Sequence, residues 1–145
     1  DGGLELMTSD GALAARLQRL VREWPVEFLV RIRGELDEPH QAAILRGELD
    51  DGRALAVESL EGSEEEAEIS NRWYRVRITG ASGKDVRQLF ERQGALVSRV
   101  QRTALGPLAL TRDLNRGQFR ALTSEEAALL RSSKRVATAP KTPDR

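Results

Sequence analysis

Cysteine is absent from the 145-residue sequence and histidine occurs once, and these shortages exclude several kinds of functional site. Without cysteine the chain cannot build a disulfide scaffold, a zinc ribbon, an iron–sulfur centre or a cysteine nucleophile. A histidine-rich metal site needs more than His40, and a catalytic triad would depend on that residue alone. His40 stands beside acidic residues at the start of an expected helix, which is typical of a solvated surface histidine. We therefore expect no metal site.

Long apolar runs are also missing, and aromatic residues make up only 4% of the chain. No run approaches the roughly 20 apolar residues that a membrane-spanning helix needs. With 39% apolar and 32% charged residues, the composition suits one soluble domain that can bury a core. We expect a cytoplasmic monomer with no membrane partner. Because the chain begins with Asp1 instead of methionine and has no signal-like leader, we also expect the natural protein to start further upstream.

The net charge is zero, yet the two signs are separated along the chain. Residues 35–68 carry twelve acidic side chains against Arg46 and Arg53, whereas residues 72–120 carry eleven basic side chains against three acidic ones. Almost all of the bases in the second segment are arginine, which binds phosphate through paired hydrogen bonds and stacks on nucleobases. A nucleic-acid surface is one interpretation of this segment. Solvated strand and helix faces are the other.

Hydrophobic periodicity and capping residues predict an alternation of short strands and helices. Strands are expected at residues 4–7, 26–33 (with one buried side), 53–60, 73–78, 96–100 and 118–122. Helices are expected at residues 12–22, 38–46, 84–93 and 124–130, with Asp10, Asp37 and Thr123 at three of their starts. This order predicts an α+β domain over residues 1–131, with a mixed, mostly antiparallel sheet and flanking helices. Residues 132–145 offer little that could pack, so we expect a disordered tail.

Motifs for nucleotide chemistry are missing: the chain has no phosphate loop, nucleophile elbow or dinucleotide fingerprint. The segment Gly80–Lys84 places small residues and a lysine between an expected strand and helix, but Asp85 stands where a phosphate loop has serine or threonine. A helix N-terminus that carries Lys84 and then Arg87 is still a sound place for a phosphate group. The acidic run Glu64–Glu66 has no apolar surroundings and is interpreted as a solvated loop.

Several segments match, in order, the motifs of one enzyme family. Residues 3–14 read G-L-E-L-M-T-S-D-G-A-L-A against a family run G-L-L-L-L-T-N-D-G-E-L-A. Residues 26–34 are similar to an E-Y-x-V-x-V-x-G strand, and residues 49–52 to an L-E-D-G turn. Residues 73–76 and 86–91 are similar to a W-Y-x-V strand and a V-R-R-x-x-E helix, and residues 98–123 to the closing segment. Over residues 3–131 the chain thus resembles the catalytic domain of bacterial ribosomal RNA pseudouridine synthases of the RsuA and RluB branch.

This resemblance implies an enzyme that isomerises uridine to pseudouridine in folded ribosomal RNA without a cofactor. The target nucleotide is flipped out of its stack, a family aspartate acts on it, the N-glycosidic bond breaks, and the uracil rotates and rejoins through carbon. By position, Phe28 corresponds to the aromatic residue that stacks on the base. Arg87 corresponds to the arginine that pairs with the aspartate and keeps it ionised. Lys84, Arg99 and Arg102 would hold RNA phosphates.

The sequence departs from the family pattern at several positions. The family's aspartate lies five residues before Gly3, in a G-R-L-D turn, so we expect the nucleophile upstream of this chain and the chain alone to be inactive. Phe28 replaces a tyrosine, which keeps the stacking face and loses the hydroxyl. Gln88 replaces an arginine, and Gly80–Lys84 carries fewer charges than the family's E-G-R-N-R.

Three functions therefore stay open. The first is the catalytic core of a ribosomal RNA pseudouridine synthase, and the second is a degenerate relative that binds RNA or a ribosomal precursor without catalysis. The third is a protein-interaction module that uses the acidic residues 35–68. Apart from the resemblance, Phe28 would be a core aromatic residue and Arg87 a solvated helix arginine.

Overall fold

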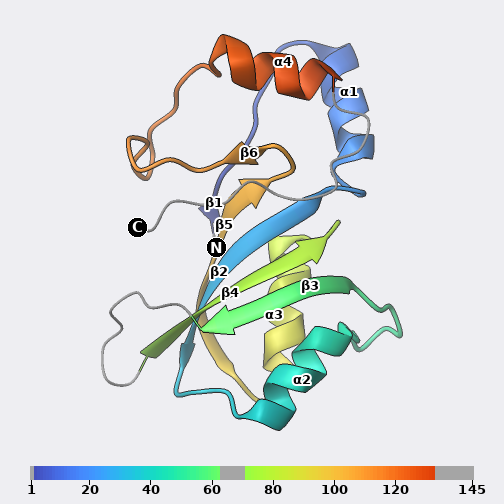
Figure 1. The fold of residues 1–145 in the computed structure, drawn as a ribbon, viewed down its shortest axis with the longest axis vertical. Helices are drawn as coiled ribbons and strands as arrows, with labels where there is room; N and C mark the ends of the chain where they lie inside the picture. The colour runs from blue at the N-terminus through green and yellow to red at the C-terminus, as the bar shows by residue number, and fades with distance from the viewer. Residues whose placement is uncertain (1, 63–70, 133–145) are drawn as a thin grey trace.

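The computed structural model describes residues 2–62 and 71–132, which form one sheet with helices beside it (Figure 1). The sheet has six strands in the order β1-β5-β2-β4-β3, with β6 paired to β5 off this path. The strands are β1 (Gly2–Gly3), β2 (Pro25–Arg33), β3 (Ala56–Gly62), β4 (Asn71–Thr79), β5 (Leu96–Leu105) and β6 (Leu108–Ala109). The helices are α1 (Gly11–Leu20), α2 (Glu38–Arg46), α3 (Gly83–Glu91) and α4 (Ser124–Ser132). The pairing of β1 with β5 is parallel and the other pairings of these strands are antiparallel, which confirms the predicted α+β class.

Three helices begin where a side-chain oxygen takes up free backbone N–H groups, as predicted. Asp10 accepts two N–H groups of the first turn of α1, at 3.0 and 3.1 Å. Asp37 accepts the amide of His40 at 3.0 Å ahead of α2. At α4 the Thr123 hydroxyl accepts the Glu126 amide at 3.1 Å, while the Glu126 carboxylate accepts the Thr123 amide at 2.9 Å. This reciprocal arrangement is a capping box, and it fixes where α4 starts.

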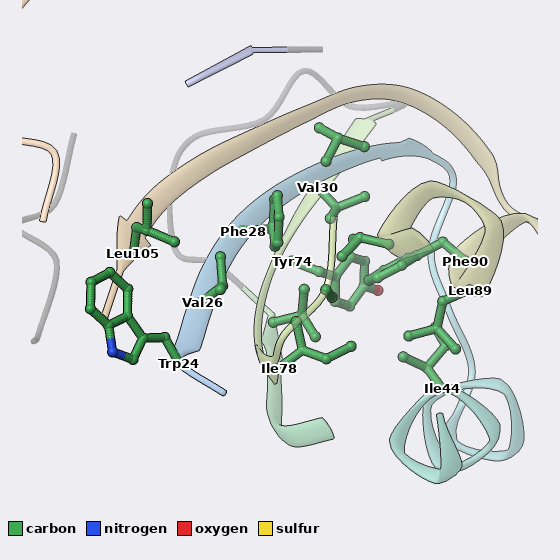
Figure 2. Packing of buried hydrophobic residues seen from close by; sticks show 14 of the residues in the cluster. Trp24, Val26, Phe28, Val30, Ile44, Tyr74, Ile78, Leu89, Phe90 and Leu105 are labelled. Carbon is green, nitrogen blue, oxygen red and sulfur yellow. The ribbon is translucent and has the colours of Figure 1, made fainter. Parts of the chain in front are cut away.

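Alternation along β2 and β4 sorts their side chains onto two faces of the sheet. On one side, called the core face, apolar residues of the two strands lie opposite each other: Val26 and Ile78, Phe28 and Val76, Val30 and Tyr74. Helices α2 and α3 add Ile44, Leu89 and Phe90 to the same buried cluster (Figure 2). Burial of such apolar surface, at about 25 cal/mol per Å², is the main source of stability for a domain of this kind.

The opposite side of the sheet, called the arginine face, is mostly charged. Its members follow from the strand register: Glu27, Leu29, Arg31 and Arg33 of β2, Trp73, Arg75 and Arg77 of β4, and Arg99 and Gln101 of β5. The prediction that β2 has one buried side is wrong, because Glu27 and Leu29 are 0% and 3% exposed. Strand β2 is central, with β5 and β4 on either side, so the long side chains of both neighbours shield it.

Two β-bulges interrupt the pairing of β2 with β5, between Glu27 and Phe28 and between Arg31 and Ile32. At a bulge, two residues of one strand oppose one residue of the other, so strict alternation is lost. The core face of β5 therefore consists of the residues opposite Ile32, Val30, Phe28 and Val26, which are Val97, Val100, Arg102 and Leu105. An arginine is thus placed on the apolar side of the strand.

Two predicted strands are wrong. The N-terminal strand is confined to β1 and does not extend over 4–7, because the Leu4 carbonyl accepts a hydrogen bond from Arg102 Nε at 2.8 Å and leaves the backbone ladder. Residues 118–122 form no strand, because Arg120 in their middle pairs with Glu126 at the start of α4.

Ser132, predicted to begin the disordered tail, is the last residue of α4. The rest of the predicted tail and the acidic run Glu64–Glu66 lie outside the described residues.

Helices α1 and α4 lie together at the end of the sheet away from α2 (Figure 1). Their buried residues Leu17 and Leu130 join the core cluster. Near this end Trp24 is 0% exposed, and Gly106, with φ at +55°, packs so closely that a Cβ there would lie 2.5 Å from the indole ring. Among the residues that the structure describes, no helix has the length and apolar character needed to cross a membrane.

Candidate functional site

The first turn of α3, the middle of β2 and β5 converge on the core face. A Cβ placed on Gly83 would lie 3.8 Å from Cε1 of Phe28 and 3.9 Å from Cγ1 of Val100, so glycine allows the helix to start in contact with both strands. Phe28 itself is 2% exposed and belongs to the core cluster. Its ring therefore packs in the core, and stacking on a base stays a prediction.

Helix α3 begins with a capping box. The Ser82 hydroxyl accepts the Asp85 amide at 3.1 Å, and the Asp85 carboxylate accepts the Ser82 amide at 3.2 Å. Lys84 lies exposed in this first turn, where the positive end of the helix dipole disfavours a cation unless an anion is bound nearby. Asp85 also pairs with Arg53 Nη2 at 3.1 Å. The predicted phosphate position at Lys84 is thus a capped, exposed helix start.

Arg87 follows one turn later and links α3 to β5. Its Nη1 donates to the Val97 carbonyl oxygen at 3.0 Å and lies 3.8 Å from the Glu91 carboxylate. The Arg87 side chain is 32% exposed, so it is neither the fully solvated helix arginine of the alternative interpretation nor a buried one. The guanidinium is held beside the first half of β5, on the same side of the sheet as Phe28.

Arg102 lies directly opposite Phe28 on the core face. Its Nε donates to the Leu4 carbonyl at 2.8 Å, which ties β5 to the segment after β1. Burial lowers the pKa of Arg102 from its usual value, an effect that the nearby Glu5 opposes. The Arg102 guanidinium thus has a structural role, and its contact with an RNA phosphate stays a prediction.

Arg99 does not join the other four predicted residues. It lies opposite Arg31 on the arginine face, whereas Phe28 and Arg102 lie on the core face with Lys84 and Arg87 on the helix above it. Simple alternation predicts this separation, since residues three apart in a strand point to opposite sides.

Sequence reasoning missed Glu27 as a notable residue. Its buried carboxylate accepts from Arg77 Nε at 3.0 Å and from the Thr103 hydroxyl at 2.9 Å, and Arg75 Nε lies 3.7 Å away. The available signal was the position of Glu27 as the one acid in β2, facing the two arginines of the alternating β4 segment.

Within residues 2–62 and 71–132 no group of three or more histidine, aspartate or glutamate side chains could hold a metal ion. His40 lies in α2 with its Nδ1 2.5 Å from Asp37 Oδ1, and both side chains are exposed. The backbone hydrogen bond from His40 lowers the pKa of Asp37 below its usual value. This pair belongs to the helix cap and is separate from the convergence at Phe28.

No protein-family profile matches the chain. It is 36% identical over 129 residues to ribosomal large subunit pseudouridine synthase B of Pseudomonas aeruginosa, and 38% identical over 130 residues to that of Salmonella typhi. These alignments cover 88% and 89% of the chain. The chain is a homologue of ribosomal large subunit pseudouridine synthase B.

The homologous region is a part of the relatives. It spans 33% of the Pseudomonas protein, and 44% of the Salmonella typhi and Escherichia coli K12 proteins. Among solved structures, one described as pseudouridylate synthase superposes with a TM-score of 0.66 at 22% identity, over 85% of this chain and 52% of that one. This likeness concerns the fold, and it agrees with the fold that the sequence resemblance implied.

Proposed function

We propose that these residues are part of the catalytic domain of an RNA pseudouridine synthase that acts on a uridine of ribosomal RNA. The observation that carries the proposal is the convergence of Gly83, Phe28 and Val100, with Arg87 tied to β5 beside them. The homology to ribosomal large subunit pseudouridine synthase B supports the choice of substrate.

In this proposal the nucleophilic aspartate is supplied by the chain ahead of Gly3. Gly2 and Gly3 pair in parallel with Gln101 and Arg102. If this register is extended backward, a residue five positions ahead of Gly3 lies beside Val97, the residue whose carbonyl accepts from Arg87. The parallel pairing therefore supports an aspartate within reach of Arg87, at the position that the family pattern requires.

The proposed reaction is an isomerisation with no net addition or loss. The aspartate acts on the flipped nucleotide, the bond between N1 and the ribose C1′ breaks, and the uracil rotates so that C5 bonds to C1′. The C5 hydrogen leaves as a proton and N1 gains one. Arg87 keeps the aspartate ionised and Phe28 supports the base, while Lys84 and Arg102 contact phosphates on either side of this point. No cofactor takes part.

Release of tritium from RNA labelled with [5-³H]uridine tests this proposal. We expect no release by the 145-residue chain, and release by the full product of its gene. In that product Arg87→Gln should abolish release while RNA is still retained on a filter. Turnover by the 145 residues alone would contradict an upstream nucleophile. A gene product without aspartate five residues ahead of Gly3 would contradict the enzymatic proposal itself.

A degenerate, RNA-binding relative with a ribosome-associated role is the second candidate. It is favoured by Phe28 and Gln88, which stand where the family pattern has tyrosine and arginine. In that case the full gene product would retain ribosomal RNA on a filter but release no tritium, even with the aspartate in place. Turnover by the double variant Phe28→Tyr, Gln88→Arg of the full gene product would show that these two residues account for the missing activity.

A further inference from the structure

The arginine face brings like charges directly opposite each other. Arg31 of β2 is paired with Arg99 of β5, immediately before the register shift between Arg31 and Ile32. Directly opposed like charges on neighbouring strands are destabilising. A protein that keeps such a pair on a partly exposed face has an arrangement that a bound polyanion would stabilise.

Arg31 is held in place on this face from two sides. Its Nε donates to the Ser98 hydroxyl at 2.8 Å, and its guanidinium carbon lies 5.6 Å from the centre of the Trp73 ring. These contacts fix the side chain without supplying a negative charge, because a hydroxyl and an aromatic ring carry no net charge.

A second arginine pair is ordered by the buried carboxylate beneath it. Glu27 contacts the Nε atoms of Arg77 and Arg75 at 3.0 and 3.7 Å, and both arginine side chains are 22% exposed. On the other side of Arg75, Glu61 of β3 lies opposite it on the same face. On β2, β3, β4 and β5 together the face carries five arginines and two glutamates, so positive charge is in excess.

This charged face is separate from the candidate site. Phe28, Val100 and Arg102 lie on the other side of the sheet. Leu29 and Ala104 are buried on the arginine face, but neither belongs to the core cluster that α2 and α3 complete. On this face, the arginines and Trp73 therefore cover a small number of buried apolar side chains.

We propose that the arginine face binds the phosphate backbone of RNA, as a contact distinct from the one at Phe28 and Arg87. This proposal rests on the proposed function in taking RNA as the partner. Charge complementarity supports it, since arginines two positions apart on a strand are separated by about 6.6 Å and can each meet a successive phosphate. The buried Glu27 and the Ser98 contact reduce the side-chain freedom that binding would otherwise have to remove.

The variant Arg99→Gln tests the proposal, with Arg46→Gln as the control. Arg46 is an exposed arginine in the last turn of α2, so the control removes the same charge away from the face. Binding of the 145-residue chain to a fluorescein-labelled RNA hairpin is measured by anisotropy at several salt concentrations. For Arg99→Gln we expect about fivefold weaker binding at 0.1 M salt and a log–log salt slope smaller by about one. The control should change the slope little.

Thermal unfolding supplies the second readout. Because Arg99→Gln removes a like-charge repulsion, its melting temperature should stay the same or rise while RNA binding weakens, which loss of fold would not produce. Equal slopes for Arg99→Gln and the unmodified chain would overturn the proposal. This outcome is independent of tritium release: the enzymatic proposal can fail while Arg99 governs RNA affinity, and the reverse also holds.

Discussion

The Glu27 carboxylate receives a hydrogen bond from Arg77 Nε at 3.0 Å at a point where the glutamate side chain is 1% exposed. The two residues are direct neighbours across β2 and β4. Thr103 completes the arrangement from β5 by donating to the other carboxylate oxygen at 2.9 Å. Three strands that are distant in sequence are therefore joined by one side chain.

Removal of this carboxylate should destabilise the domain. We expect Glu27→Ala to lower the free energy of unfolding by about 3 kcal/mol, because it removes the buried carboxylate that two arginines and the Thr103 hydroxyl contact. The lower end of the usual range applies, since the arginine side chains are 22% exposed. Urea unfolding at pH 7 measures the change, with Glu58→Ala on the exposed side of β3 as the control. A loss equal to that of the control would show that the buried pairing contributes nothing.

The pair of Arg120 with Glu126 predicts a pH dependence. Hydrogen bonding from Arg120 lowers the pKa of Glu126 from 4.5 to about 2. Because the folded-state pKa lies below the unfolded one, the stabilisation is complete above about pH 4.5 and is lost as the pH falls toward 2. We expect about 1–2 kcal/mol, since the side chains are 31% and 21% exposed and water screens the pair.

Arg120→Gln should therefore lower the urea midpoint at pH 7 and have little effect near pH 2. The measurement is the difference between the two proteins at each pH, with Arg116→Gln as a charge-matched control. A difference that persists unchanged at low pH would assign the effect to something other than ionisation of Glu126.

Gly106 should resist substitution more strongly than another glycine of similar backbone angle. Gly106→Ala would place Cβ 2.5 Å from the indole ring of Trp24, which is 0% exposed and has no room to move. We expect a loss of about 3 kcal/mol or more from strain and overpacking. Gly52 has φ at +86° with open space around it, so Gly52→Ala should cost only about 1 kcal/mol. Similar losses at both positions would contradict the predicted contact with Trp24.

Arg87→Lys separates charge from geometry at the candidate site. Lysine keeps the positive charge. Its single ammonium, however, does not reproduce a guanidinium that donates to the Val97 carbonyl and, in our proposal, also pairs with the upstream aspartate. In the full gene product we expect tritium release to fall by about 100-fold with RNA affinity nearly unchanged. Arg92→Lys, on the turn after α3, is the control. A parallel loss of RNA binding would place Arg87 in the binding of phosphate instead.

Local signals predicted the elements whose causes are local. Asp10, Asp37 and Thr123 cap helices because their side chains reach amides two or three residues away, and such contacts are visible in the sequence. The alternation of residues 73–78 likewise predicted β4, and the family resemblance predicted the fold that homology and superposition support.

The features that were missed depend on distant strands. The burial of Glu27 requires Arg77 and Thr103, which lie 50 and 76 residues away along the chain. The bulges in the pairing of β5 with β2 cannot be predicted from the two-residue alternation of a strand, because a bulge depends on how the two strands pair. The predicted strand at 118–122 failed for a different, local reason: Arg120 pairs with Glu126, only six residues further along the chain.

The contact between Leu4 and Arg102 has a kinetic consequence. The Leu4 amide donates to the Arg102 carbonyl at 2.8 Å, and Arg102 Nε donates back to the Leu4 carbonyl across a separation of 98 residues. Closing so long a loop loses chain entropy that only a few bonds repay, so β1 should join the sheet late in folding and leave it early in unfolding. The edge of β5 at Gln101 and Arg102 is thus assembled last, and hydrogen exchange at Leu4 would follow its opening separately from that of the core.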